Sequence, residues 1–361
     1  MNEPGIKLTS YFGERERVDD RFLADALFDL YERHRMRTSV LLRGAEGFGQ
    51  RHELHTDRLL TLSESLPTVS IAIDTRERIE RALPEVLELA GGGLTTLERA
   101  RLITGAALEP AALAGDQNGT VKLTLYGGRS VRAGGQPGYI AAVDRLRAAG
   151  AVGASVLLAV DGTLHGERRR ARFFARNADV PLMLLAIGER VSLATALPEL
   201  ARLLEDPVAT VERVQVCKSA GALLAEPSAV AERDRSGLPI WQKLMVHCEE
   251  QAKLDGHPLH VELVRRLRAA GAAGATVLRG VRGFYGDHEP FADRLLSLRR
   301  NVPMLVVVID TPGNIRRWWP IVDEATRADG LVTSELVPAS HGLAGERGEI
   351  ALAKTPTTRT D

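Results

Sequence analysis

The chain has 361 residues with 47 basic and 47 acidic side chains, so its formal net charge is zero at pH 7. This balance gives no support to a protein that binds nucleic acid or a membrane surface over its whole length. No run reaches the ~18 apolar residues of a membrane span, and residues 1–5 contain no apolar signal region. The two cysteines, Cys217 and Cys248, lack the spacing of a disulfide framework. We therefore expect a cytoplasmic protein that does not insert into membranes.

One stretch of sequence occurs three times with changes. Each copy opens on Lys-Leu, at positions 7, 122 and 243, and Arg-Gly follows at the same distance in the first and third copies, at 43–44 and 279–280. The spacing is that of a small domain and is too long for a solenoid unit of ~20–50 residues. We predict three tandem copies of one domain and a disordered tail, namely copy 1 (1–104), copy 2 (119–218), copy 3 (239–340) and the tail (341–361).

The hydrophobic pattern predicts the same order of elements in each copy. In copy 1 we expect a first strand at Lys7, then a helix and two further strands over 21–33, 39–42 and 68–73. In copy 2 the corresponding helix and strands fall over 139–149, 155–160 and 181–187. In copy 3 the order is strand, helix, strand, strand, helix and strand over 243–247, 259–267, 275–278, 304–309, 315–326 and 331–333, with an added short helix over 291–300. This order predicts an α+β chain of three tandem ferredoxin-like βαββαβ domains.

The segments between copies change in composition. Residues 104–119 and 218–239 are rich in Gly, Ala, Pro and small polar residues. Such a composition is typical of flexible linkers. We therefore expect the copies to be free to pack in more than one order.

A glycine-rich loop follows the second strand of copy 3, over 271–286. Glycines at this density let the backbone approach a ligand closely, so that consecutive N–H groups can face a phosphate. Glycines also serve ordinary hairpin turns. The loop alone leaves both interpretations open.

Several motifs of copy 3 occur together in one known family. They are the opening Lys-Leu, Gly-x-Pro-Leu at 256–259, Gly-Ala-Thr-Val-x-Arg-Gly at 274–280, a strand that ends at Asp310, and Gly-Leu-Val-Thr at 330–333. The run 271–286 resembles the segment that leads into the T-loop of nitrogen-regulatory PII proteins. Copy 3 as a whole resembles the PII-like family labelled domain of unknown function 190. The resemblance covers nearly all of copy 3, most of copy 1 and the outline of copy 2.

The resemblance implies an architecture and a kind of ligand. It implies ferredoxin-like domains that trimerise around their sheets and bind adenine nucleotides in clefts between neighbours. One neighbour gives the T-loop base and the next gives the turn before its last strand. We therefore expect the three copies to close into an intramolecular pseudo-trimer, so that one chain is a monomer that imitates a homotrimer.

The resemblance also implies the residues of the nucleotide site. In copy 3 they are Gly274, Thr276, Arg279, Gly280, Gly283 and Phe284 on the T-loop side, with Gly330, Leu331 and Thr333 on the turn. Copy 1 keeps Arg43, Gly44, Gly47, Phe48, Gly93 and Leu94. Copy 2 departs most, because Ala159 replaces the glycine of Arg-Gly, Thr163 replaces the phenylalanine, and Pro207 replaces the turn glycine and lacks an N–H. Only the cleft between copies 1 and 3 keeps both halves, and we expect one tight site per chain.

The expected function is regulatory. A PII-like chain would sense AMP, ADP or ATP and act on a partner protein such as a membrane transporter or channel, without catalysis. The alternative is a nucleotide-converting enzyme that uses loop carboxylates such as Asp287 or Glu289 with a metal. The sequence contains no nucleophile and base signature, which favours the regulatory interpretation.

Other polar groups have ordinary interpretations. The histidine pairs at 52 and 55 and at 257 and 260 lack a third convincing ligand, so we expect no metal there. Asp74 and Asp310 end strands, where an Asx turn or helix cap and a ligand contact remain equally open. The arginines at 43 and 279 are equally open to a phosphate or a carboxylate partner. We expect Trp318 and Trp319 to cover the core or an inter-domain contact and not to stack a base. For the basic run 168–170 a solvated helix face is favoured over an anion site.

Overall fold

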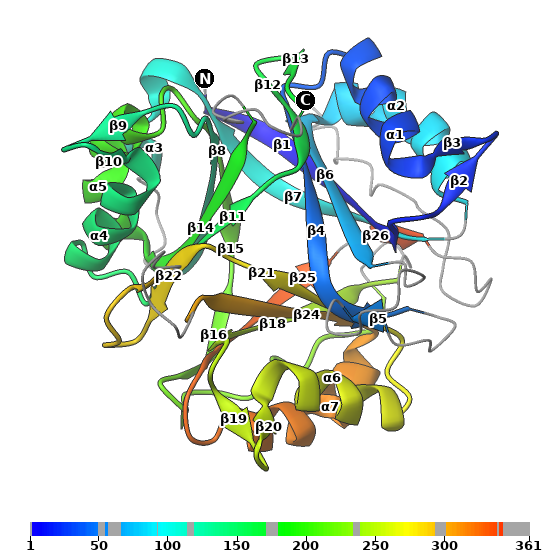
Figure 1. Cartoon of the computed structure of the whole chain (residues 1–361), viewed down its shortest axis with the longest axis vertical. Coiled ribbons are helices and arrows are strands. Elements are labelled where there is room, and N and C mark those ends of the chain that lie inside the picture. The colour runs from blue at the N-terminus through cyan, green and yellow to red at the C-terminus, as the bar shows by residue number, and fades with distance from the viewer. Residues whose placement is uncertain are drawn as a thin grey trace, which may run out of the picture.

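The computed structural model describes residues 2–49, 55–56, 66–91, 93–113, 119–170, 180–233, 239–292, 301–337 and 339–341. Figure 1 shows three lobes around a centre, each with its helices on the outside and its strands toward the middle. None of the described helices is both long and apolar enough to cross a membrane.

Each copy has the four main strands and two helices that the sequence predicts. In copy 1 they are β1 (Asn2–Gly13), α1 (Leu23–Arg33), β4 (Thr38–Phe48), β6 (Pro67–Thr75), α2 (Arg76–Ala90) and β7 (Leu94–Ile103). In copy 2 they are β8 (Thr120–Gly127), α4 (Gly138–Ala148), β11 (Gly153–Leu158), β14 (Leu182–Glu189), α5 (Arg190–Leu203) and β15 (Val208–Arg213). In copy 3 they are β18 (Trp241–Glu249), α6 (Leu259–Ala269), β21 (Ala275–Arg279), β24 (Pro303–Asp310), α7 (Pro312–Ala325) and β25 (Leu331–Val337).

The strand order within each copy is that of a ferredoxin-like domain. In copy 3, β18 lies between β25 and β24, and β21 pairs with the other side of β24, all antiparallel. The same fourth, first, third, second order holds in copy 1 and in copy 2. The predicted fold class is confirmed.

A short hairpin precedes the first helix of each copy, which the sequence did not predict. The hairpins are β2 (Arg17–Val18) with β3 (Arg21–Phe22), β9 (Arg132–Ala133) with β10 (Gln136–Pro137), and β19 (Lys253–Leu254) with β20 (His257–Pro258). In copy 3 the two turn residues, Asp255 and Gly256, both have positive φ. A two-residue turn with positive φ at both positions suits the twist of a hairpin. The Gly-x-Pro-Leu motif at 256–259 therefore spans the hairpin turn, β20 and the first residue of α6.

The connections between copies are more ordered than their composition suggests. The first contains η1 (Gly105–Ala107) and α3 (Pro110–Leu113), and Leu108 and Leu113 are buried in the core of copy 2. The second extends the sheet through β16 (Gln215–Ser219) and β17 (Ala222–Leu223), and buried Lys218 pairs with Asp323 at 2.7 Å. The prediction of flexible linkers is wrong for these residues, because apolar side chains of the first connection are buried and β17 of the second, although exposed, pairs with β16.

Two more predicted segments differ or cannot be compared. Phe291–Ala292 forms β23, a strand where a helix was expected, and 293–300 lie outside the described residues. Of the expected disordered tail, His341 ends β26 (Ala339–His341) and 342–361 lie outside the described residues. Arg168 lies in β13 (Glu167–Arg168) and pairs with Asp161 and Asp29. The basic run is thus part of an ion-pair cluster between copies 1 and 2 and not a solvated helix face.

The second strands close the three copies into a ring. Each continues past its own sheet as an arm that pairs with the second strand of a neighbour. The arms are residues 44–48 of β4 in copy 1, β12 (Asp161–Leu164) in copy 2 and β22 (Arg282–Tyr285) in copy 3. The copy 1 arm pairs with β21 of copy 3, the copy 3 arm with β11 of copy 2, and the copy 2 arm with β4 of copy 1.

The fourth strands close the ring a second time, in the opposite sense. The end of β7 pairs with β15 of copy 2, β16 pairs with β25 of copy 3, and β26 pairs with β7 of copy 1. As a result the main strands of all three copies belong to one 20-stranded sheet within the described residues. The expected intramolecular pseudo-trimer is confirmed, and the pairings fix the direction of the ring.

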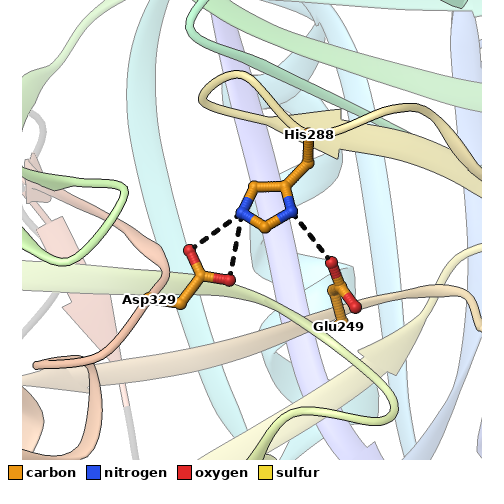
Figure 2. A group of neighbouring side chains, drawn as sticks. All are labelled: Glu249, His288 and Asp329. Carbon is orange, nitrogen blue, oxygen red and sulfur yellow. Dashed lines mark hydrogen bonds and ion pairs between the residues drawn. The ribbon is translucent and has the colours of Figure 1, made fainter.

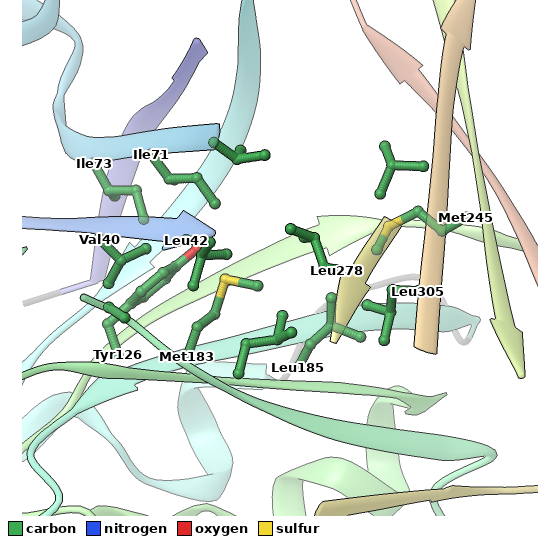
Figure 3. Packing of buried hydrophobic residues seen from close by; sticks show 14 of the residues in the cluster. Val40, Leu42, Ile71, Ile73, Tyr126, Met183, Leu185, Met245, Leu278 and Leu305 are labelled. Atoms are coloured by element: carbon green, nitrogen blue, oxygen red, sulfur yellow. The ribbon is translucent and has the colours of Figure 1, made fainter. Parts of the chain in front are cut away.

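Within the one sheet, the four main strands of each copy are buried on both faces. The outer faces pack against helices of the same copy and form three separate clusters. The inner faces meet in one shared cluster that includes Ile71 of copy 1, Met183 of copy 2 and Leu305 of copy 3. Figure 3 shows these side chains converging from the three copies. Burial on both faces explains why the strands read as near-continuous apolar runs.

Charged side chains also meet at the centre, where they form an axial hexad. Its members are Lys7, Glu98, Lys122, Glu212, Lys243 and Glu335, all buried. Each lysine lies 3.1, 3.1 or 3.3 Å from the glutamate of its own copy. Each also pairs with the glutamate of the next copy. The hexad is a closed ring of alternating charge with no net charge, which is how a buried charge avoids a large desolvation cost.

Candidate functional site at the loop bases

The glycines predicted to cradle phosphate lie in the arms or, in the case of Gly280, just before one. A side chain added at Gly283 would collide with the Ala154 carbonyl of copy 2, and one at Gly47 with the Ala275 carbonyl of copy 3. At Gly44 and Gly280 it would meet the proline that begins the third strand of the same copy, at 2.6 and 2.7 Å. Gly47 and Gly283 therefore let two copies approach each other closely, and Gly44 and Gly280 let the chain pass close to its own third strand.

Two backbone N–H groups just before the copy 3 arm donate hydrogen bonds within the protein. Gly280 N–H donates to the Pro303 carbonyl at 2.8 Å, and Val281 N–H donates to the Val156 carbonyl of copy 2 at 2.9 Å. The copy 1 arm has the same setting, because Gly47 lies opposite Thr276 of copy 3. Gly274 is adjacent, since a side chain there would lie 3.1 Å from the Phe48 carbonyl.

The phenylalanines of the arms anchor one copy in another. Phe48 of copy 1 is buried in the helix-side core of copy 3. Phe284 of copy 3 is buried in the helix-side core of copy 2. In copy 2 the corresponding Thr163 lies 3.0 Å from the Ser39 hydroxyl of copy 1. The sequence grouped both phenylalanines with the nucleotide site, and the structure places both in neighbouring cores.

The arginines at the arm bases pair with carboxylates. Arg43 lies 2.9 Å from Glu14, and Arg279 pairs with Glu250 at the equivalent place in copy 3. Copy 2 has Leu158 there, and its Arg129 instead donates to the Ala159 carbonyl. The sequence left a phosphate and a carboxylate open as partners of Arg43 and Arg279, and in the structure both arginines pair with a carboxylate.

The predicted turn residues lie at the start of the fourth strand. A side chain at Gly93 would collide with the Tyr11 carbonyl, and Gly330 has a φ of 124°. Leu94 and Leu331 pack in the shared central cluster, and Thr333 is buried on the ring interior. In copy 3 the turn lies beside the arm of its own copy, because Asp329 accepts a hydrogen bond from Tyr285 at 2.8 Å.

A cluster of three titratable side chains lies beside this copy 3 turn. Glu249 ends β18, His288 follows β22, and Asp329 precedes β25. His288 Nδ1 lies 3.3 Å from Glu249 Oε1, and Nε2 lies 3.2 Å from Asp329 Oδ2. Figure 2 shows the imidazole between the two carboxylates. The three side chains keep 38%, 19% and 29% exposure for His288, Glu249 and Asp329, so solvent reaches them.

Neighbouring polar groups hold both carboxylates in place. Asn301 Nδ2 donates to Glu249 Oε2 at 2.8 Å, and the backbone N–H of Gly330 donates to Asp329 Oδ1 at 2.7 Å. Tyr285 also packs against the His288 ring, with centroids 5.0 Å apart. Burial raises the pKa of the adjacent Cys248 thiol to about 12, so this cysteine does not add a thiolate.

The cluster belongs to copy 3 alone. At the positions of Glu249 and Asp329, strand register and sequence give Gly13 and Gly92 in copy 1 and Gly128 and Asp206 in copy 2. Sequence reasoning missed the cluster, since its members lie far apart in the chain. Of the loop carboxylates in the enzyme alternative, Glu289 instead pairs with Arg147 of copy 2 at 2.9 Å.

The remaining polar groups have structural roles. Asp310 accepts from the Thr311 N–H and from Asn314 Nδ2, each at 2.8 Å, and Asp74 accepts from the Arg37 N–H at 2.8 Å. Both aspartates therefore hold turns and caps, one of the two roles left open. The tryptophans at 318 and 319 are buried in the copy 3 core, as expected.

Three of the four histidines in the pairs at 52 and 55 and at 257 and 260 lie among the described residues. His257 is exposed and His260 is buried, on either side of the start of α6. His55 lies in β5 (His55–Thr56), and His52 lies outside the described residues.

Comparisons with known proteins agree with the architecture. The family model DUF190, described as an uncharacterized ACR, matches residues 5–102, 120–216 and 241–339. A UPF0166 protein of Aquifex aeolicus (strain VF5) is 29% identical over 92 residues, which cover 26% of this chain and 86% of that protein. A UPF0166 protein of Methanocaldococcus jannaschii is 27% identical over 106 residues, which cover 29% of this chain and 94% of that protein.

Among solved structures, an aspartate kinase from Synechocystis aligns over 94% of this chain and 45% of its own length. The alignment has 9% identity and a TM-score of 0.27, which carries no weight for fold or function. The family match, in contrast, falls on each of the three ferredoxin-like units in turn. The chain belongs to the DUF190 family, with three copies of the family domain in one polypeptide.

Proposed function

We propose that this chain is a regulatory protein that binds an adenine nucleotide at the junction of copies 1 and 3 and acts on a partner protein. The observation that carries the proposal is the arm arrangement, in which residues 44–48 of copy 1 lie along β21 of copy 3. A ligand at this arm base would contact two copies at once. Its binding would change how the copy 1 arm is held against copy 3, and a partner protein would respond to that change.

The junction of copies 1 and 3 is favoured over the other two by its residues. It brings Gly44, Gly47 and Phe48 of copy 1 together with Gly274 and Thr276 of copy 3. The other two junctions each include copy 2, which departs most from the family motif. The phosphates would be recognised by Arg43, whose exposed guanidinium now pairs with Glu14 and has donors to share.

Calorimetry with AMP, ADP and ATP on the intact chain tests the proposal, followed by separation of bound from converted nucleotide. We expect one site per chain, a Hill coefficient near one, and recovery of the nucleotide unchanged. Arg43→Gln should weaken binding at least ~tenfold, because it removes a charge-assisted contact of about 1.5–3 kcal/mol. Arg33→Gln is the matched control, since Arg33 is likewise an exposed arginine of copy 1 paired with a glutamate but lies on α1, outside the arm.

The same measurements separate the alternatives. Three equivalent sites would contradict the choice of one junction, and no binding would contradict nucleotide sensing altogether. Conversion of ATP with added metal would support the nucleotide-converting alternative.

We also propose that one chain is the functional unit in solution. Both sets of inter-copy strand pairs already close within a single polypeptide. A chain that has paired these edges with its own copies offers few open strands to another chain. Light scattering should give a mass near 39.2 kDa. A stable trimer of chains would contradict this proposal.

A further inference from the structure

The cluster of Glu249, His288 and Asp329 has a deficit of positive charge. Two carboxylates face one imidazole, one at each ring nitrogen. Within the described part of the chain, neither carboxylate has a lysine or arginine nitrogen within 4.0 Å. Arg147 reaches the same loop, but its guanidinium pairs with Glu289.

A neutral imidazole cannot satisfy this arrangement. It has one N–H donor and one lone pair, so it can donate to only one carboxylate. The other nitrogen then meets a carboxylate oxygen with lone pair against lone pair, at 3.2 or 3.3 Å. A cation beside one ring nitrogen would remove this conflict, because that nitrogen could bind the ion while the other donates its N–H to the carboxylate that faces it.

We propose that Glu249, His288 and Asp329 bind a divalent first-row metal ion such as Zn²⁺. Their ligand atoms all lie within 4.8 Å of one another, so small shifts of the side chains would bring all three to the ~2.0–2.2 Å at which zinc binds nitrogen and oxygen. One imidazole nitrogen with carboxylate oxygens is a donor set that suits zinc and its neighbours, and three protein ligands leave a coordination position open.

The surroundings of the cluster match those of metal sites. In such sites, hydrogen bonds from outside hold the ligating carboxylates in orientation. Here Asn301 holds one oxygen of Glu249 and leaves Oε1 toward the cluster, while Tyr285 and the Gly330 N–H hold Asp329. These three donors come from the start of the third strand, the arm and the turn before β25. The ion would thus tie the copy 3 arm to its own sheet where that arm also pairs with copy 2.

This site goes beyond the proposed nucleotide site, and its test uses no nucleotide. The untagged full chain, freed of metal with a chelator, is titrated with Zn²⁺ by calorimetry, and Co²⁺ is added separately to record its visible absorption. We expect one Zn²⁺ per chain. Glu249→Gln, His288→Gln and Asp329→Asn should each weaken the affinity by roughly 10- to 100-fold or more, since even loss of a supporting residue has such an effect.

Two control variants change residues of the same types as the proposed ligands, but outside the cluster. Asp206→Asn changes the carboxylate that copy 2 has at the place of Asp329, and His257→Gln changes an exposed histidine of copy 3. Both should bind Zn²⁺ as the parent chain does. The carboxamide substitutions keep side-chain shape, and circular dichroism verifies that each variant is folded.

Two outcomes would overturn the proposal. One is a parent chain that binds no Zn²⁺ and gives the Co²⁺ spectrum of the free ion, which would mean that a proton and not a metal supplies the charge. The other is Zn²⁺ binding that none of the three variants weakens, which would place the ion elsewhere. Neither outcome bears on nucleotide binding, which is measured separately through Arg43.

Discussion

The axial hexad and the cluster of Glu249, His288 and Asp329 both join charged side chains from distant parts of the chain. They differ in how many of the three copies contribute. At the axis every copy contributes one lysine and one glutamate, and each charge is paired on both sides. In the cluster the two carboxylates, Glu249 and Asp329, both come from copy 3, whereas copy 1 has glycine at both equivalent positions.

The difference has a physical reason. Each lysine of the hexad faces the glutamate of the next copy, so a change in one copy leaves a buried charge in another without its partner. The cluster of Glu249, His288 and Asp329 lies outside the axis, so a substitution there affects one junction alone. A homotrimer would carry every substitution three times. Three copies in one chain can keep a symmetric centre and still give a single loop a site of its own.

The largest expected effect is at the axis. Glu98→Gln leaves Lys7 and Lys243 each with one carboxylate in a buried setting. Loss of one member of a buried ion-pair network costs about 3–5 kcal/mol, and we expect the free energy of unfolding to fall by that amount. Denaturant unfolding measures the change.

Glu77→Gln is the control for this prediction, because Glu77 pairs with Arg81 on an exposed helix face. Surface pairs contribute about 0.2–1 kcal/mol. An equal, small effect of both substitutions would show that the hexad is not a stabilising unit. If the axis matters as a network, Lys7→Met added to Glu98→Gln should cost less than the sum of the two single substitutions.

The hexad also predicts loss of stability in acid. Burial alone would raise the pKa of Glu98, but Lys243, Lys7 and Lys122 hold it well below its usual range, and the pKa of Glu335 is lowered in the same way. A carboxyl with a depressed folded pKa contributes stability above its unfolded pKa and loses it as pH falls through the folded pKa. The free energy of unfolding should therefore fall steeply below pH ~4.3. Glu98→Gln should flatten that slope, and an unchanged slope would contradict the assignment.

A second pH effect comes from a difference between copies near the axis. His247 stands where the other copies have Tyr11 and Tyr126, as strand register shows. Burial lowers the pKa of His247 to about 4. His247 then binds a proton near pH 6.5 in the unfolded chain but not in the folded chain. The free energy of unfolding therefore falls as pH drops from 6.5 to about 4.

The size of this effect follows from the shift. Each pKa unit corresponds to about 1.4 kcal/mol, so we expect a loss of roughly 2–3 kcal/mol over that range. His247→Tyr, which copies the residue of copies 1 and 2, should remove the slope in chemical denaturation at pH 4.5, 5.5 and 6.5. A slope that persists in this variant would mean that another group titrates there.

The arms should show a smaller effect. Gly283→Ala places a methyl group against the Ala154 carbonyl of copy 2, and we expect a loss of about 1–3 kcal/mol from overpacking. Gly49→Ala is the matched control, because an added side chain there meets nothing within 4 Å. Thermal unfolding compares the two. Equal melting temperatures would show that the arm can move without cost and that the strand pairing between copies is weak.

Sequence reasoning reached the fold because its signals were local. The alternation of apolar strands and amphipathic helices repeats in each copy, and periodicity of this kind fixes the order of elements. It could not find the arms, because Gly47 and Gly283 have the composition of a loop whether they bind phosphate or pack against a carbonyl. It noted the lysine of each copy as a landmark, yet nothing in the local pattern pairs Lys7 with Glu212.

What the sequence determined by itself is the unit, a βαββαβ domain present three times, together with the prediction that the units close on one another. The tertiary structure decided which edges meet and in which direction, because strand pairing between copies depends on backbone geometry that no single copy contains. It also brought Glu249, His288 and Asp329 together, since the ends of two strands and a loop meet only once the sheet has formed. Local periodicity specifies elements, whereas a site made from three separate segments exists only after they pack.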